Sequence, residues 1–65
     1  MDWKTRLKDE HRELHNRRKK LLIFLGGEEC RKLDPREQEA LEAQHDVMRA
    51  YEGILWRRLQ RAESA

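Results

Sequence analysis

The sequence has few of the residues that cross-link or reshape a small protein. Cysteine, proline, phenylalanine and tyrosine occur once each, and glycine occurs three times. A single cysteine, Cys30, cannot form a disulfide within the chain. The longest uninterrupted apolar run, residues 21–25, is far shorter than the roughly 18 residues that cross a bilayer. We therefore expect no disulfide framework and no membrane segment. Because no apolar leader follows Met1, we also expect a cytoplasmic protein.

Charged residues are plentiful, but the two signs nearly balance. Of the 65 residues, 43% are charged and 37% are hydrophobic, and the net charge is +2. A chain this short and polar holds a single domain, residues 1–65, with a thin apolar core. Because burial within one such chain covers little of the entropy lost on folding, we expect a homo-oligomer, a dimer or larger.

The first half of the chain has apolar residues at helical spacing. Neither glycine nor proline interrupts this pattern over residues 2–25, which we predict to be one helix. Gly26 and Gly27 follow, and we expect glycine to end the helix in the left-handed backbone conformation. We predict a turn over residues 26–34, with Cys30 as a small buried residue at its tip.

The second half begins with a clear helix start. Asp34 is suited to cap a helix, Pro35 fits the first helical position, and Glu37 follows the cap by three residues as in a capping box. Apolar residues then continue at helical spacing. We therefore predict a second helix over residues 35–61.

A short link makes two such helices antiparallel neighbours. If facing residue numbers sum to about 62, the seam between the helices is apolar at each level. The facing pairs are then Leu7 with Leu55, Leu14 with Met48, and Leu21 with Leu41. We predict the fold class to be all-α, an antiparallel two-helix hairpin that assembles into a four-helix bundle or a higher oligomer. The same register places the basic residues 17–20 beside the acidic residues Glu37, Glu39, Glu42 and Asp46.

No residue pattern predicts catalysis, a cofactor or a resident metal. His11 and His15 share a helical face, but Glu13 does not follow the first histidine directly, as a zinc-protease motif requires. Cys30 has no histidine near it in the hairpin register. The carboxylates lie among lysines and arginines, where nothing raises their pKa for acid-base work. We therefore expect a binding protein rather than an enzyme.

The open end of the predicted hairpin is the strongest candidate for a binding site. Tryptophan beside arginine is typical of protein interfaces and equally of sites that stack a base and hold its phosphate. The candidate residues for binding a partner or a nucleotide are Trp3, Lys4, Trp56, Arg57, Arg58 and Arg61. Small residues on one flank of the second helix allow another backbone to approach. The candidate oligomer interface therefore consists of Ala43, Ala50, Gly53 and Trp56.

Several residues also carry a family resemblance. These are residues 10–14 (Glu-His-Arg-Glu-Leu), Lys20, Leu21, Phe24, Leu33, Gln44, Met48, Tyr51, Leu55 and Arg58. In this pattern the chain resembles short phage-encoded helical-hairpin proteins related to an uncharacterised crAss-like phage protein. The resemblance implies a phage accessory protein that works in the host cytoplasm, with counter-defence or host takeover as its context.

Three hypotheses for function follow. The leading one is a phage accessory protein that binds a host protein, in the context of counter-defence. The alternative is an oligomeric sponge that sequesters an anionic nucleotide immune signal between protomers, with Trp56 and Arg57, Arg58 or Arg61. A third, a nucleic-acid-binding accessory factor, is disfavoured by the low net charge of +2. Nucleotide sequestration requires arginines of two protomers to converge on a cavity, whereas protein recognition requires an exposed apolar patch.

Overall fold

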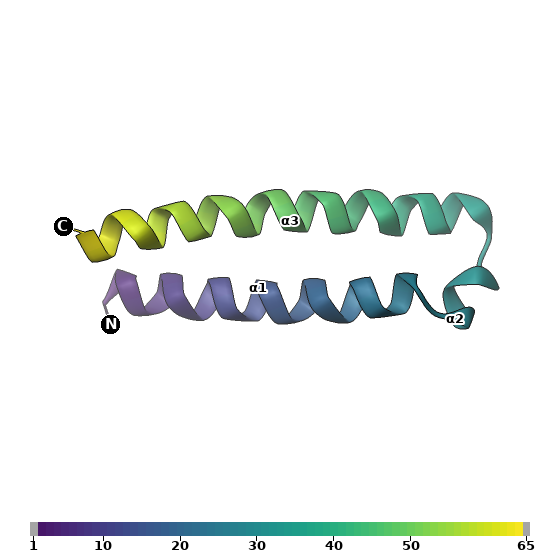
Figure 1. The fold of residues 1–65 in the computed structure, drawn as a ribbon, viewed down its shortest axis with the longest axis horizontal. Coiled ribbons are helices and arrows are strands. Elements are labelled where there is room, and N and C mark those ends of the chain that lie inside the picture. The colour runs from purple at the N-terminus through teal and green to yellow at the C-terminus, as the bar shows by residue number, and fades with distance from the viewer. Residues whose placement is uncertain (1, 65) are drawn as a thin grey trace.

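The chain folds as a helical hairpin. In the computed structural model, which describes residues 2–64, the elements are α1 (Trp3–Leu25), α2 (Glu28–Arg31) and α3 (Pro35–Ser64). The two long helices lie side by side and antiparallel, and α2 joins them at one end (Figure 1). The predicted all-α hairpin is confirmed, and within residues 2–64 there is no strand.

Helix α1 begins and ends through local hydrogen bonds. The Asp2 carboxylate accepts a hydrogen bond from the backbone N–H of Lys4 at 3.2 Å, as a helix cap does. At the other end Gly26 has φ −87° and ψ −3°, which is right-handed, so the expected left-handed glycine was wrong. Gly27 is extended instead, with φ −96° and ψ 170°, and this change in ψ turns the chain away from the helix axis.

The turn contains the short helix α2 and a capped start for α3. Cys30 in α2 is buried, as predicted. An Asp34 carboxylate oxygen accepts a hydrogen bond from the backbone N–H of Arg36 at 2.8 Å, which confirms Asp34 as the cap. The side-chain amide of Gln38 donates to the backbone carbonyl of Leu33 at 2.8 Å and so fastens α3 to the turn. Helix α3 continues to Ser64, a few residues beyond the predicted end.

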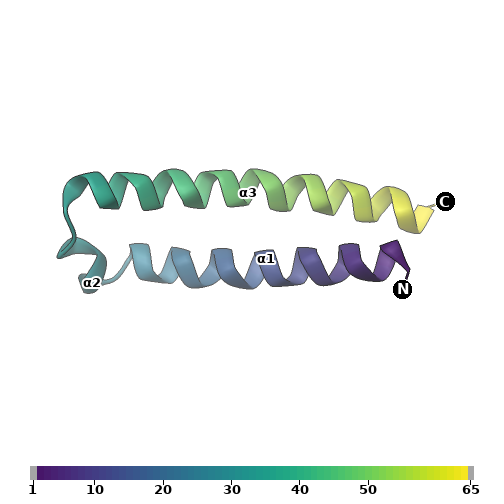
Figure 2. The ribbon, with the colours of Figure 1, turned by 180° about the vertical axis from the view of Figure 1, so that it is seen from behind.

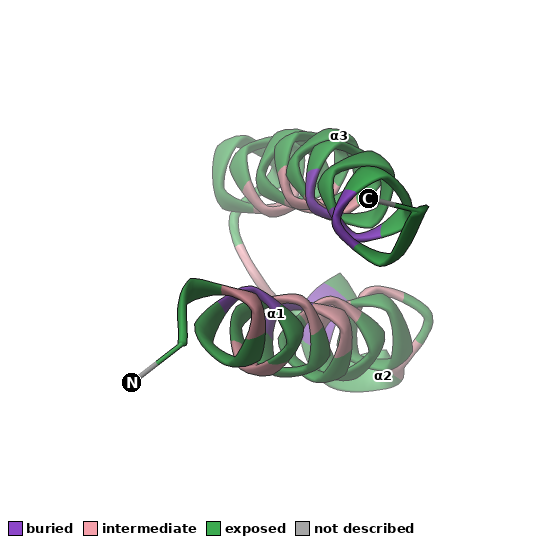
Figure 3. Ribbon diagram, turned by 90° about the vertical axis from the view of Figure 1, so that its left-hand side faces the viewer, coloured by how far each residue is buried: buried purple, intermediate pink, exposed green. Residues whose placement is uncertain are grey.

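The apolar core lies along the seam between α1 and α3. It consists of Leu7, Leu14, Leu55 and Leu59, with Met48 packed against it. Seen from the end opposite α2, the buried positions lie on the sides of the two helices that face each other, and the outer sides are exposed (Figure 3). Toward the turn, Leu21 and Leu41 are only half-buried. The seam therefore packs most tightly near the ends of the chain.

The hairpin is long and narrow. It measures 47 × 16 × 16 Å, and both chain ends lie at the end opposite α2, as the two opposed views show (Figures 1 and 2). We call this the open end. Within residues 2–64, no helix combines the length and the apolar character needed to cross a membrane.

Gly53 lies in the middle of α3, where the single hairpin leaves open space around it. A Cβ atom built at this position meets no atom within 4 Å. Because alanine is favoured over glycine inside a helix by about 1 kcal/mol, Gly53→Ala should raise the free energy of unfolding by about that amount. Urea unfolding followed by circular dichroism measures it. An unchanged or lower unfolding free energy would contradict the open surroundings of this residue.

Candidate functional site

The open end carries a hollow lined by residues from both long helices. Trp3 and Lys4 come from the first turn of α1, and Arg58, Arg61 and Ala62 come from the last turns of α3. We call it the open-end hollow. Among residues 2–64, its lining contains three cationic side chains, an indole and no carboxylate. The Lys4 ammonium lies 6.0 Å from the centre of the Trp3 ring, so charge and aromatic surface are adjacent.

The cations of this hollow have no acidic partner in the described part of the chain. The ion pairs among residues 2–64 involve none of Lys4, Arg58 and Arg61. The described lining therefore carries three positive charges, which favour the binding of an anion.

Trp3 lies at the open end of the seam but is not buried in it. Its exposed fraction is 55%, although the seam beside it is closed by buried Ala62. Alanine is too small to cover an indole ring, so most of Trp3 remains open to the hollow. The residue is thus available to contact a ligand.

Trp56 lies on a different side of the hairpin. Its ring centre is 5.8 Å from that of His11, and His11 in turn stacks on His15 at 6.4 Å. Trp56 is 53% exposed but does not line the open-end hollow. Of the six predicted binding residues, the structure therefore brings four together, Trp3, Lys4, Arg58 and Arg61.

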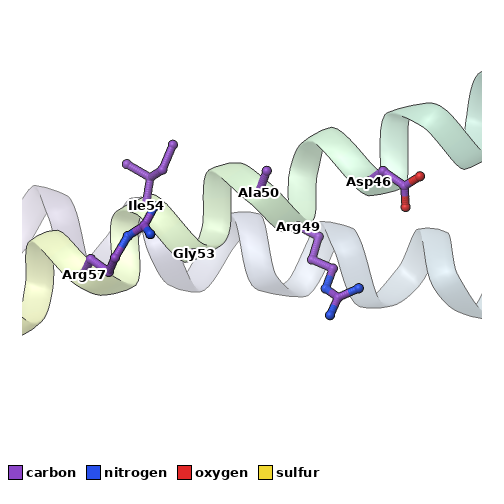
Figure 4. A pocket seen from close by; sticks show the side chains of 6 residues that line it. All are labelled: Asp46, Arg49, Ala50, Gly53, Ile54 and Arg57. Atoms are coloured by element: carbon purple, nitrogen blue, oxygen red, sulfur yellow. The ribbon is translucent and has the colours of Figure 1, made fainter.

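Arg57, the remaining predicted binding residue, lines a second hollow on the outer side of α3. The residues around this outer hollow are Asp46, Arg49, Ala50, Gly53, Ile54 and Arg57, all from α3 (Figure 4). Two of the predicted interface residues, Ala50 and Gly53, therefore lie together here. Ala43 is exposed nearer the start of the helix, and Trp56 lies outside this hollow.

A polar cluster interrupts the seam midway, and the sequence analysis missed it. The Glu52 carboxylate accepts hydrogen bonds from His15 Nδ1 at 2.6 Å and from Arg18 Nε at 3.0 Å. Arg18 Nη1 also lies 3.4 Å from His45 Nε2. The side chains of Arg18 and Glu52 are only 17% and 14% exposed. The spacing of His45 and Glu52 from Met48, three and four residues, was the available signal, because it places both on the seam.

This cluster stabilises the ionised form of Glu52. Burial alone would raise the pKa of its carboxyl group. The hydrogen bond with His15 and the positive charge of Arg18 outweigh that effect and hold the pKa below its ordinary value of 4.5. Glu52 is therefore a charged, paired residue of the seam.

Residues 17–20 were expected to lie beside the acidic start of the second helix, but their ion pairs form elsewhere. Arg18 pairs with Glu52, farther along α3, and Arg17 pairs with Glu13 of its own helix at 3.6 Å. Among residues 2–64, no ion pair joins the basic run to Glu37, Glu39, Glu42 or Asp46. Arg18 turns into the seam, where its Nε donates to Glu52 Oε2 in a less hydrated place.

The residues described contain no group of three or more histidine, cysteine, aspartate or glutamate side chains placed to hold a metal ion. The fold and the site define a short antiparallel helical hairpin with a basic, indole-lined hollow at its open end. A family model described as Sequestin matches residues 1–61, and the chain belongs to the Sequestin family. No curated protein and no solved structure matches the chain significantly.

Proposed function

We propose that this protein sequesters a small anionic ligand of the nucleotide type in the open-end hollow. The observation that carries the proposal is the convergence of Lys4, Arg58 and Arg61 on one hollow that also holds Trp3 and to which the described residues add no carboxylate. The family name, Sequestin, supports a role in holding a molecule rather than converting it. The protein then acts by stoichiometric binding, without catalysis.

The chemistry of the hollow fits both parts of a nucleotide. An indole face stacks on a base of any sequence, and the exposed ring of Trp3 provides such a face. Guanidinium groups form paired hydrogen bonds with phosphate oxygens, and Arg58 and Arg61 are one helical turn apart on α3. Lys4 adds a third positive charge from α1.

The biological context of the proposal rests on the resemblance to phage-encoded hairpins. A phage protein that binds a nucleotide in the host cytoplasm would remove a signal of host immunity before its receptor meets it. Binding of a host protein, our leading hypothesis from the sequence, would instead use the exposed apolar residues. We place ligand sequestration first because the cationic hollow and the family name both favour it.

The test compares two charge-reversed variants. In Arg58→Glu/Arg61→Glu, two cations of the open-end hollow become acidic. The control, Lys19→Glu/Lys20→Glu, makes the same change of net charge on exposed residues of α1. The probes are cyclic dinucleotides, cyclic trinucleotides and ADP, screened by thermal shift and then measured by calorimetry.

At least one nucleotide should bind the wild-type protein, with an affinity that falls as salt rises. The double variant of the hollow should lose about 100-fold in affinity or more, because a hydrogen bond to a charged group contributes about 1.5–3 kcal/mol. The control should bind within a few-fold of wild type. A panel without any binder, or equal binding by the hollow variant and the wild type, would contradict the proposal.

A further inference from the structure

The outer side of α3 carries a second apolar stripe, separate from the seam. Its residues alternate in spacing between three and four, which is the spacing of a coiled-coil contact. They are Ala40, Ala43, Val47, Ala50 and Ile54. Val47 and Ile54 are 68% and 46% exposed, so α1 does not cover this stripe. Ala50 and Ile54 point to the same side of α3, whereas Arg49 points to the other (Figure 4). We call these five residues the outer stripe.

We propose that the outer stripe binds the outer stripe of a second copy of this chain, with the two α3 helices antiparallel. If facing residue numbers sum to about 97, Val47 meets Ala50 of the second copy and Ile54 meets its Ala43. Each large side chain then faces a small one. Gly53 adjoins Ala50 in the outer hollow and leaves open space beside it, which lets the second backbone come close.

The charges of α3 select the antiparallel direction. Acidic residues dominate its first half and arginines its second half. They are Glu37, Glu39, Glu42 and Asp46, followed by Arg49, Arg57, Arg58 and Arg61. In the proposed register Arg57 faces Ala40 of the second copy, next to its Glu39, and two-fold symmetry makes this contact twice. A parallel pairing would place Arg57 beside Arg57.

The same two residues are available for this contact in the single hairpin. Among residues 2–64, the ion pairs involve neither Glu39 nor Arg57. The side-chain sizes along the outer stripe and the charges of α3 therefore both fit a second copy of the same surface. This interface contains Ala43, Ala50 and Gly53 of the interface predicted from the sequence, but not Trp56. It does not depend on the ligand proposed above, because the open-end hollow contains neither Arg57 nor the outer stripe.

Analytical ultracentrifugation tests the contact with a matched pair of variants. The wild-type protein should form a dimer as its concentration rises. Val47→Asp would bury a carboxylate against Ala50 of the second copy, and it should raise the dimer dissociation constant by about 100-fold. Ile23→Asp is the control, because Ile23 is 74% exposed on α1 and lies outside the stripe. It should associate as wild type does, and all three proteins should keep the same helical circular dichroism.

A charge exchange then tests direction and register. Arg57→Glu should raise the dissociation constant by about 10-fold, since two attractive pairs become repulsive. Adding Glu39→Arg to the same chain should restore it by exchanging the signs. A wild-type protein that remains monomeric would overturn the proposal and leave the stripe for another protein. Equal dimerisation of Val47→Asp and wild type, or a double variant weaker than Arg57→Glu alone, would overturn it as well.

Discussion

Replacing Leu55 with aspartate should abolish the folded hairpin. Leu55 has an exposed fraction of 0%, the lowest in the core. A carboxylate at that position loses its hydration without gaining a partner, which costs several kcal/mol. A domain of this size has only a few kcal/mol of stability to lose. The far-ultraviolet circular dichroism of Leu55→Asp should therefore lose most of its helical signal at neutral pH.

Gln44→Asp is the control for the seam, since Gln44 lies on the same helix but is exposed. It introduces the same side chain and should retain the helical signal and a cooperative unfolding transition. If Leu55→Asp and Gln44→Asp unfold alike, charge in α3 rather than burial in the seam would be responsible. A folded Leu55→Asp would mean that the seam is not the source of stability.

The helices and their seam could be predicted because helical geometry fixes which side each residue faces. Apolar residues at three- and four-residue spacing place Leu7, Leu14 and Leu55 on facing sides, and the structure confirms them as core. The ending of α1 could not be predicted in the same way. Glycine permits left- and right-handed endings alike, and here Gly26 stays right-handed while Gly27 makes the turn.

The binding residues were only partly grouped by the sequence. Neighbours in a helix differ by about 100° in direction, so closeness in sequence does not place side chains on one surface. Trp56, Arg57 and Arg58 are consecutive, yet they lie against His11, in the outer hollow and in the open-end hollow, respectively. The sequence therefore identified the residue types of the site, but it did not show that they lie on three different surfaces.

The mid-seam cluster was missed for a related reason. Arginine and glutamate are usually exposed to solvent, so the sequence pattern gives no reason to expect Arg18 and Glu52 in the seam. Burial of these two residues is favourable because each is the partner of the other. Arg18 on α1 donates a hydrogen bond to Glu52 on the facing helix α3 at 3.0 Å. Such a pair depends on two helices at once, and the pattern within either helix does not show it.

Because the pKa of Glu52 is lowered, the stability of the hairpin depends on pH in the acidic range. Because its folded pKa lies below the ordinary value of 4.5, the folded state binds its proton less readily than the unfolded state. The ionised Glu52 therefore stabilises the fold fully above pH 4.5, and this contribution is lost as the pH falls through the folded pKa. Its hydrogen bonds with His15 and Arg18 are the interactions that protonation weakens.

Glu52→Gln should lower the free energy of unfolding by about 2 kcal/mol at about pH 5, since glutamine keeps the shape of the side chain but loses its charge. At about pH 2.5 the difference should be smaller, because the wild-type carboxyl is increasingly protonated as the pH falls through its folded pKa. Urea unfolding of both proteins at the two pH values measures this change.

Glu29→Gln is the control. Glu29 pairs with Lys32 at 3.3 Å, but its side chain is 76% exposed, so the loss should stay below about 1 kcal/mol at either pH. Equal losses for Glu52→Gln and Glu29→Gln, or a loss for Glu52→Gln that is undiminished in acid, would show that the Glu52 charge does not stabilise the seam.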